Sequence, residues 1–184
     1  ASLYPITKTY APWYSTEPTQ FAELAPDVIF LEAGTSVPIG DEGMYLDVLG
    51  PLSRHADDNN NSLILRLIAG EQSFLFTGDM RSEEAAEVLA AYQDRLQADV
   101  WKVPYHGRAE SVSETFLAAV HPKLSFVCAD RETHPDSADS ACLEMLSAVS
   151  EIYCTDDAIL GWHLTIASDG TYTVENLQSA DHSP

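Results

Sequence analysis

The sequence predicts an α/β protein built from one mixed β-sheet and its helices, and three observations carry this prediction. The chain has 184 residues, of which 45% are hydrophobic and 21% charged, as in a globular domain with a real core. Predicted strands and helices alternate through the second half of the chain, a pattern typical of layered α/β folds. No linker interrupts this pattern, so we expect a connecting segment at 1–27 and one structural unit at 28–184.

The first half of the chain predicts mainly strands. Two apolar, alternating runs stand on either side of Gly70-Glu71, and they predict a β-hairpin. The expected elements, in order, are a helical patch at Glu17–Leu24, an apolar run at Val28–Leu31, and strands at Tyr45–Leu49, Ser62–Ala69 and Ser73–Thr77.

Three helix–strand units and a closing hairpin are predicted for the second half. Ser82 and Ser111 are expected to cap the first two helices, because a serine side chain can accept a bond from a free N–H of the first turn. The expected helices are Ser82 to about Leu96, Ser111–Val120 and Asp139–Val149. The expected strands are Asp99–Pro104, Lys123–Ala129 and Ile152–Thr155, followed by the hairpin of Trp162–Ala167 and Thr171–Val174.

Composition narrows the classes of function. Aspartate and glutamate number 29 against 9 lysines and arginines, a net charge of -20, and such a surface repels phosphate backbones unless a metal or a local basic patch intervenes. The sequence shows no basic–aromatic patch of the kind that binds nucleic acid. Three cysteines without a CxxC pair argue against a zinc knuckle, and Cys128 and Cys154 are interpreted as core thiols.

Membrane-spanning segments and leader peptides are recognised in a sequence by their long apolar runs. No apolar run reaches about 18 residues, so no transmembrane segment is predicted. The chain opens without methionine and without a basic-then-apolar leader, and we therefore expect a processed or excised piece of a longer protein.

Two polar residues follow neighbouring predicted strands and form the best candidate site. Asp79 comes directly after the strand that ends near Thr77, and His106 comes directly after the strand that ends at Pro104. If these strands are adjacent, the carboxylate and the imidazole converge, and together they suit zinc, manganese or iron. The alternative is purely structural: Asp79 caps a turn before the next helix, and His106 is a loop histidine. Two ligands alone do not complete a zinc site.

His134 is a third candidate, in the loop after the strand Lys123–Ala129. A histidine there can line the same cleft as a general acid or a substrate contact, although an exposed loop histidine before a proline is the structural alternative. No GxSxG nucleophile elbow and no phosphate-binding P-loop is present in the sequence.

The ordered motifs resemble the C-terminal half of a metallo-β-lactamase domain of the ComEC competence-protein type. The segments NNNSLILRL, SFLFTGD, ADVWKVPYHG, PKLSFVCA and THP follow one another in the order and spacing of the family motifs NN-S-LVL, LLTGD, ADVLKVPHHGS and a GHP loop. The similarity covers roughly residues 28–175.

This resemblance implies the C-terminal part of an αββα sandwich with a metal cluster at the edge of its two sheets. Members of this kind are metal-dependent hydrolases, often of phosphoesters, and the ComEC domain is linked to degradation of the non-transported DNA strand during uptake. By position, Asp79 would be the metal-bridging carboxylate, His106 the late histidine ligand, and His134 a cleft residue near the substrate. The intact domain would hold zinc or manganese. A bacterial source is implied, with the protein extracytoplasmic or tethered to a membrane protein.

The departures from the family pattern set two hypotheses. The HxHxDH motif, which supplies most ligands, is absent from these residues, Tyr105 stands where the family has a first histidine, and Arg108 stands where it has a serine. Either the first half of the domain supplies the missing ligands to a hydrolase in which Tyr105 or His134 assists the leaving group, or the chain is a non-catalytic, metal-free structural or interaction module. The charge of -20 makes a nuclease a weaker expectation than a general hydrolase.

Overall fold

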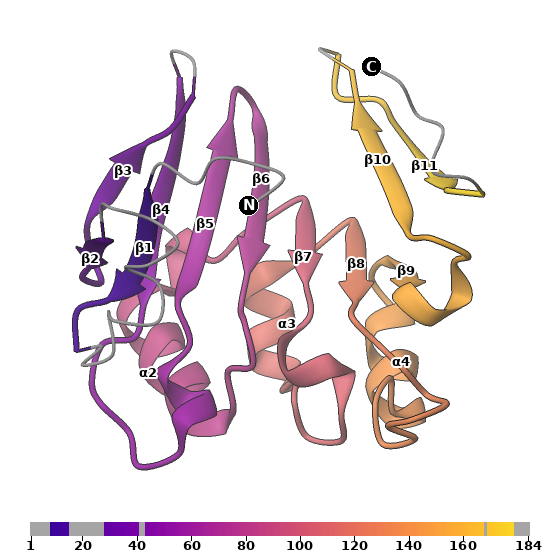
Figure 1. Ribbon diagram of the computed structural model, residues 1–184, viewed down its shortest axis with the longest axis horizontal. Coiled ribbons are helices and arrows are strands. Elements are labelled where there is room, and N and C mark those ends of the chain that lie inside the picture. Colours follow the sequence, from indigo (N-terminus) through magenta and orange to yellow (C-terminus); the bar gives the residue numbers. More distant parts are fainter. Residues whose placement is uncertain (1–7, 15–27, 41–42, 168, 179–184) are drawn as a thin grey trace, which may run out of the picture.

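A computed structural model describes residues 8–14, 28–40, 43–167 and 169–178, and it confirms a mixed α/β fold. Within these residues the main sheet has seven strands in the order β3-β4-β5-β6-β7-β8-β9 (Figure 1). Their bounds are β3 Ser36–Pro38, β4 Met44–Gly50, β5 Ile64–Ala69, β6 Gln72–Phe76, β7 Val100–Lys102, β8 Leu124–Val127 and β9 Glu151–Cys154. The predicted β5–β6 hairpin is confirmed, whereas the short edge strand β3, which contains a proline, was not predicted from the sequence.

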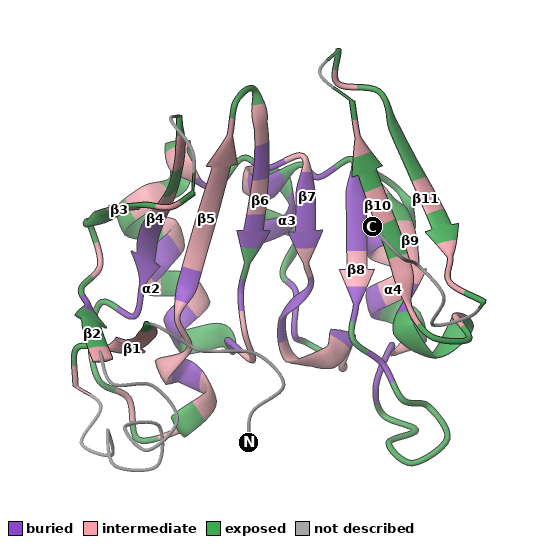
Figure 2. Cartoon of the chain, turned by 45° about the horizontal axis from the view of Figure 1, so that its top comes forward, coloured by how far each residue is buried: buried purple, intermediate pink, exposed green. Residues whose placement is uncertain are grey.

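The sheet is antiparallel from β3 to β6 and parallel from β6 to β9. The antiparallel pairs β3–β4 and β5–β6 are joined by short turns, β4 and β5 by a longer loop that contains the 3-10 helix Asp58–Asn61, and each parallel pair needs a helical crossover. The crossovers are α2 Ser82–Tyr92, α3 Glu114–Val120 and α4 Ser140–Ser147. All three helices cover one face of the sheet (Figures 1 and 2), as expected when successive crossovers share one handedness.

The hydrophobic core lies between the sheet and these helices. Leu75, Trp101 and Val127 point from adjacent strands into it and are fully buried. The ring of Trp101 stacks on Phe116 of α3, with the ring centroids 5.9 Å apart, and its Nε1 donates to the Thr77 hydroxyl. The core therefore holds β6, β7 and α3 rigidly together, next to the sheet edge where the two strands end.

The first two predicted helix caps are wrong by one or two residues. Helix α2 includes Ser82, and its cap position is Arg81, whose side chain makes no capping bond. The Asn60 side chain accepts from the N–H groups of Arg81 and Glu84 instead, so a loop distant in sequence closes this helix end. Helix α3 is capped by Ser113, which accepts from the Phe116 N–H, and not by Ser111.

The opposite face of the sheet carries two small two-stranded sheets. The parallel pair β1 Thr9–Pro12 and β2 Val28–Leu31 lies in front of the β3–β4 end of the main sheet (Figures 1 and 2). The predicted hairpin is observed as β10 Trp162–Ile166 and β11 Tyr172–Asn176, and it lies in front of the β8–β9 end. The helical patch expected at Glu17–Leu24 is outside the described residues.

The cysteines divide differently from the prediction. Cys142 and Cys154 are buried, but Cys128 is exposed, so its interpretation as a core thiol is wrong. Strand β8 ends at Val127, and Cys128 therefore already belongs to the loop that leaves the sheet. Among the described residues, no helix has both the length and the apolar character needed to cross a bilayer.

Candidate functional site

Asp79 and His106 come together at the edge where β6 and β7 end. Because these strands are parallel and Phe76 pairs with Lys102, their C-terminal ends lie side by side. Asp79 follows β6 by three residues, and His106 lies in a 3-10 turn, η3 Pro104–Gly107, that follows β7. The Asp79 Oδ2 atom is 3.4 Å from the His106 Nε2 atom, so the convergence expected from the strand order is present.

The ring of His106 is oriented by its second nitrogen. Its Nδ1 lies 2.8 Å from the carbonyl oxygen of Cys128, at the end of β8. A carbonyl can only accept, so the Nδ1–H donates to it, and Nε2 is the ring nitrogen that faces Asp79. Histidine ligands of metals are commonly fixed in this way, with the far N–H donated to a carbonyl or carboxylate.

The backbone of η3 is held in an unusual conformation. Tyr105 and His106 have φ values of 48° and 60°, in the left-handed region that residues with a Cβ rarely occupy, and Gly107 continues it with φ 63°. Bonds from the Ala138 N–H to the His106 carbonyl and from the Asp139 N–H to the Gly107 carbonyl fix this turn. Backbone strain of this kind concentrates at functional sites, where it aims specific side chains.

The backbone of Asp79 is supported from below by a polar loop. Its N–H donates to the Ser62 hydroxyl at 3.0 Å, and Gly78 permits this approach because a Cβ there would lie 2.8 Å from the same serine. The Ser62 N–H in turn donates to Glu84, which is completely buried and has one carboxyl oxygen without a hydrogen-bond partner. Burial raises the pKa of the Glu84 carboxyl to about 8.

Lys102 is a site residue that the sequence reasoning did not single out. Its Nζ lies 3.6 Å from Asp79 Oδ1 and donates to the Gly78 carbonyl at 2.5 Å. The ammonium group therefore partly balances the Asp79 carboxylate at Oδ1, whereas His106 faces Oδ2. The signal was present in the sequence, as a lysine at the end of an otherwise apolar strand that precedes the candidate histidine.

The ring of Tyr105 is in contact with two arginines. The Arg81 guanidinium carbon lies 5.2 Å and that of Arg108 4.9 Å from the ring centroid. Both distances are within the range of cation–π attraction. The absence of a basic–aromatic patch for nucleic acid stays a prediction, but the folded chain does bring Arg81 to Tyr105 from 24 positions away in the sequence.

His134 lies in the exposed loop between β8 and α4. Its backbone N–H donates to Asp130, and its carbonyl accepts from Ser137, so the loop forms a closed turn. This loop packs on η3 through its far end, at Ala138. Among the described residues, no hydrogen bond or ion pair joins the His134 side chain to Asp79 or His106, and its role in the cleft stays a prediction.

A second cluster of potential metal ligands fits a metal poorly. Within the described residues, one group of three ligand atoms lies close enough to hold an ion, namely Cys154, Asp156 and Asp157. Arg131 already binds both aspartates, at 2.7 Å and 2.5 Å. Burial raises the pKa of the Cys154 thiol to about 11, which disfavours the thiolate that a metal requires. Asp79 and His106 are thus the better pair, although they supply only two ligands.

Comparison with known proteins links this chain to competence proteins. No family model matches the chain. It is 32% identical to ComE operon protein 3 of Bacillus subtilis over 91 residues, 32% identical to competence protein ComA of Neisseria gonorrhoeae over 101 residues, and 30% identical to the uncharacterized protein YcaI of Escherichia coli over 91 residues. The matched stretches cover 49–53% of this chain but only 12–15% of each relative. About half of this chain is therefore similar to a small part of much longer proteins, two of which are named for competence.

Proposed function

We propose that this chain is one half of a metal-dependent phosphoester hydrolase domain that serves DNA uptake. The observation that carries the proposal is the Asp79–His106 pair, in which a carboxylate and an oriented imidazole meet at 3.4 Å on one sheet edge. The similarity to competence proteins supports the connection with DNA uptake, and the ordered sequence motifs support the metallo-β-lactamase assignment.

The donor set fits half of a metal site. One carboxylate oxygen and one imidazole nitrogen suit zinc or manganese, but a stable site needs one or two further protein ligands. When bound, such an ion supplies Lewis-acid polarisation and activates water near neutral pH. Asp79 and His106 would hold the ion, and Lys102 would balance the charge of Asp79. Tyr105, the residue before His106, would face the substrate.

The open face of the sheet supports a second layer that brings the missing ligands. One cross-strand row on that face consists of Leu65, Phe76, Lys102, Phe126 and Tyr153. Phe76 is 42% exposed although it lies on a central strand. The sheets β1–β2 and β10–β11 stand at the two ends of this face, so its middle is the natural seat of further strands (Figure 2).

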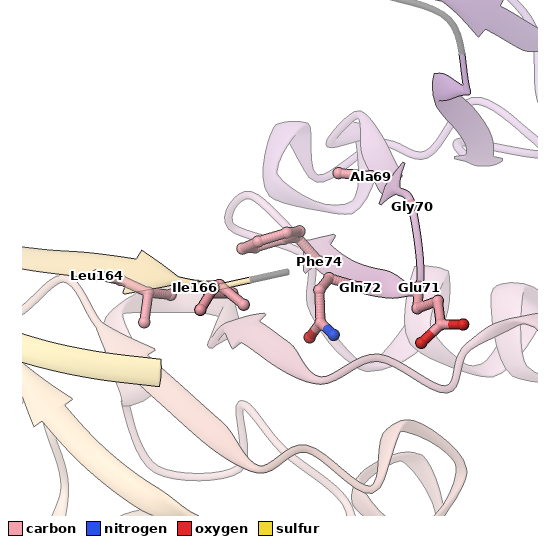
Figure 3. Close-up of a pocket in the computed structure, with 8 residues that line it drawn as sticks. Ala69, Gly70, Glu71, Gln72, Phe74, Leu164 and Ile166 are labelled. Atoms are coloured by element: carbon pink, nitrogen blue, oxygen red, sulfur yellow. The ribbon is translucent and has the colours of Figure 1, made fainter. Parts of the chain in front are cut away.

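A cavity with a mostly apolar lining lies at one end of this face. It has a volume of about 640 Å³ and lies between the β5–β6 turn and the β10 strand. Figure 3 shows Phe74 from β6 and Ile166 and Leu164 from β10 along its wall. A smaller hollow is lined by Phe76, Phe126 and Lys102, and the Lys102 ammonium lies 3.6 Å from Asp79. A second layer packed into this hollow would therefore lie close to the candidate ligands.

Metal binding by the chain alone tests this proposal. Titration calorimetry with zinc and with manganese is expected to show weak binding, which Asp79→Asn and His106→Gln each remove. Asp94→Asn, at an exposed aspartate in the 3-10 helix Gln93–Arg95 that follows α2, is the matched control and is expected to keep the binding. Addition of the first half of the domain is expected to raise affinity sharply and to give hydrolysis of a chromogenic phosphodiester. Tight stoichiometric binding by the chain alone, or none with both halves present, would contradict the proposal.

Lys102 favours a second candidate function, a metal-free interaction module. Its ammonium already lies 3.6 Å from Asp79 and provides a positive charge where a cation would act. In that case millimolar zinc would leave the NMR signals of His106 unchanged, even with both halves of the domain present. The same titration on Lys102→Gln then separates the candidates, because a latent site gains metal affinity when the competing ammonium is removed.

A further inference from the structure

We propose that Arg81 and Arg108, held around Tyr105, form a seat for a phosphate group beside the Asp79–His106 pair. The inference deepens the proposed function and rests on it for the identity of the reaction, but the seat itself requires no metal. Neither arginine is one of the two proposed metal ligands, and the sequence motifs assign neither of them a role.

The distribution of charge singles out this place. The chain has only 9 lysines and arginines against 29 acids, yet Arg81, Lys102 and Arg108 gather around one sheet edge. The Arg81 and Arg108 guanidinium carbons lie 5.2 Å and 4.9 Å from the centroid of the same Tyr105 ring. An anion beside this ring is therefore attracted by both positive charges.

Each guanidinium retains donors for a ligand. Arg81 contacts Asp57 through Nη1 at 2.6 Å, and Arg108 contacts Asp136 through Nε at 3.0 Å, in a geometry that is not a hydrogen bond. Guanidinium groups carry five N–H donors, so most of each fork remains for another acceptor. Exposed ion pairs of this kind contribute little free energy, and the side chain of Asp136 is 64% exposed, so a phosphate can compete with them.

The η3 turn connects this seat to the candidate chemistry. Tyr105 and His106 are consecutive, and their left-handed backbone directs one ring to the two arginines and the next ring to Asp79. The seat and the Asp79–His106 pair therefore share one turn of the backbone, and Arg81 follows Asp79 by only two residues. Guanidinium forks match the paired oxygens of a phosphate better than an ammonium does, which makes a phosphoester the favoured class of anion.

Binding of inorganic phosphate to the metal-free chain tests the seat. Phosphate is titrated at pH 7 and low salt in the presence of a chelator and followed by two-dimensional NMR of the Tyr105–Arg108 amides and by calorimetry. Arg81→Gln and Arg108→Gln are each expected to weaken binding at least about tenfold, because one charge-assisted bond contributes about 1.5 kcal/mol or more. Lys123→Gln, which removes the same charge at the opposite end of β8, is expected to change it less than about twofold.

The outcomes separate this seat from the proposed function. Saturable phosphate binding that both arginine variants weaken supports the seat, whether or not the chain binds metal. No saturation at tens of millimolar phosphate, equal binding of acetate, or equal loss in Lys123→Gln would each overturn it. Tyr105→Phe keeps the ring and is expected to retain binding, whereas Tyr105→Leu removes the platform and is expected to lose it. Failure of the Asp79→Asn metal test with these results intact would refute only the hydrolase.

Discussion

The two faces of the seven-stranded sheet are formed by the same strands but differ in how deeply their apolar side chains are buried. On the helix-covered face, Leu75 and Trp101 are fully buried, whereas on the opposite face their neighbour Phe76 is 42% exposed. Successive side chains of a strand point to opposite faces, so this contrast arises between adjacent residues of one segment. Among the described residues, the core is therefore buried on the helix-covered side and partly exposed at Phe76 on the other, with the candidate site at the sheet edge between the two faces.

Truncation of a buried side chain on the helix-covered face is expected to have the largest effect on stability. Trp101→Ala removes a fully buried ring and its bond to Thr77, and we expect the free energy of unfolding to fall by about 3–5 kcal/mol. Urea denaturation followed by circular dichroism measures the change. A loss below about 1 kcal/mol would show that the helix-covered face is not the stabilising core.

The pH dependence of stability is expected to report the buried acid beneath the site. Burial raises the pKa of Glu84 from 4.5 to about 8, so the folded chain holds this proton where the unfolded chain releases it. Stability contributed by the protonated acid is therefore complete below about pH 4.5 and is lost as the pH rises toward about 8. Glu84→Gln is expected to flatten this part of the curve and to make the protein more stable by a few kcal/mol at pH 8. An unchanged slope in urea denaturation across this pH range would contradict the assignment.

Loss of the Ser62 hydroxyl is expected to have a smaller effect, at the boundary between the faces. Ser62→Ala leaves the Asp79 N–H without its acceptor, and we expect a loss of about 1 kcal/mol in the free energy of unfolding. Chemical shifts of Asp79 and His106 should change as well, because the serine sets the position of the Asp79 backbone. If neither the stability nor these shifts change, the polar loop does not support the site.

The open face provides the smallest expected effect and the sharpest contrast. Phe76→Ala in this chain is expected to change the free energy of unfolding by less than about 1 kcal/mol, because the ring is already partly in water. In a protein that contains the second sheet, the same substitution is expected to cost about 3 kcal/mol, as for a buried ring. Equal losses in the two backgrounds would mean that no layer covers this face.

The main strands and crossovers could be predicted from the sequence because hydrophobic periodicity is local. The proximity of Asp79 and His106 was also predictable, since it follows from two strand ends in one sheet. The caps at Asn60 and Ser113 were not, because the first depends on a loop 21 residues before Arg81 and the second on where the helix starts. The Arg81–Tyr105–Arg108 cluster was missed for the same reason, because it depends on the reach of side chains from separate loops.

The open face also bears on the colloidal behaviour of the protein. An exposed apolar side chain such as Phe76 favours contact with a second copy of the same surface, whereas a net charge of -20 drives copies apart. As acid neutralises the carboxylates or salt screens them, that long-range repulsion weakens while the apolar attraction remains. The acidic composition thus keeps copies of this sheet face apart, and we expect reversible self-association in mild acid, which light scattering would measure.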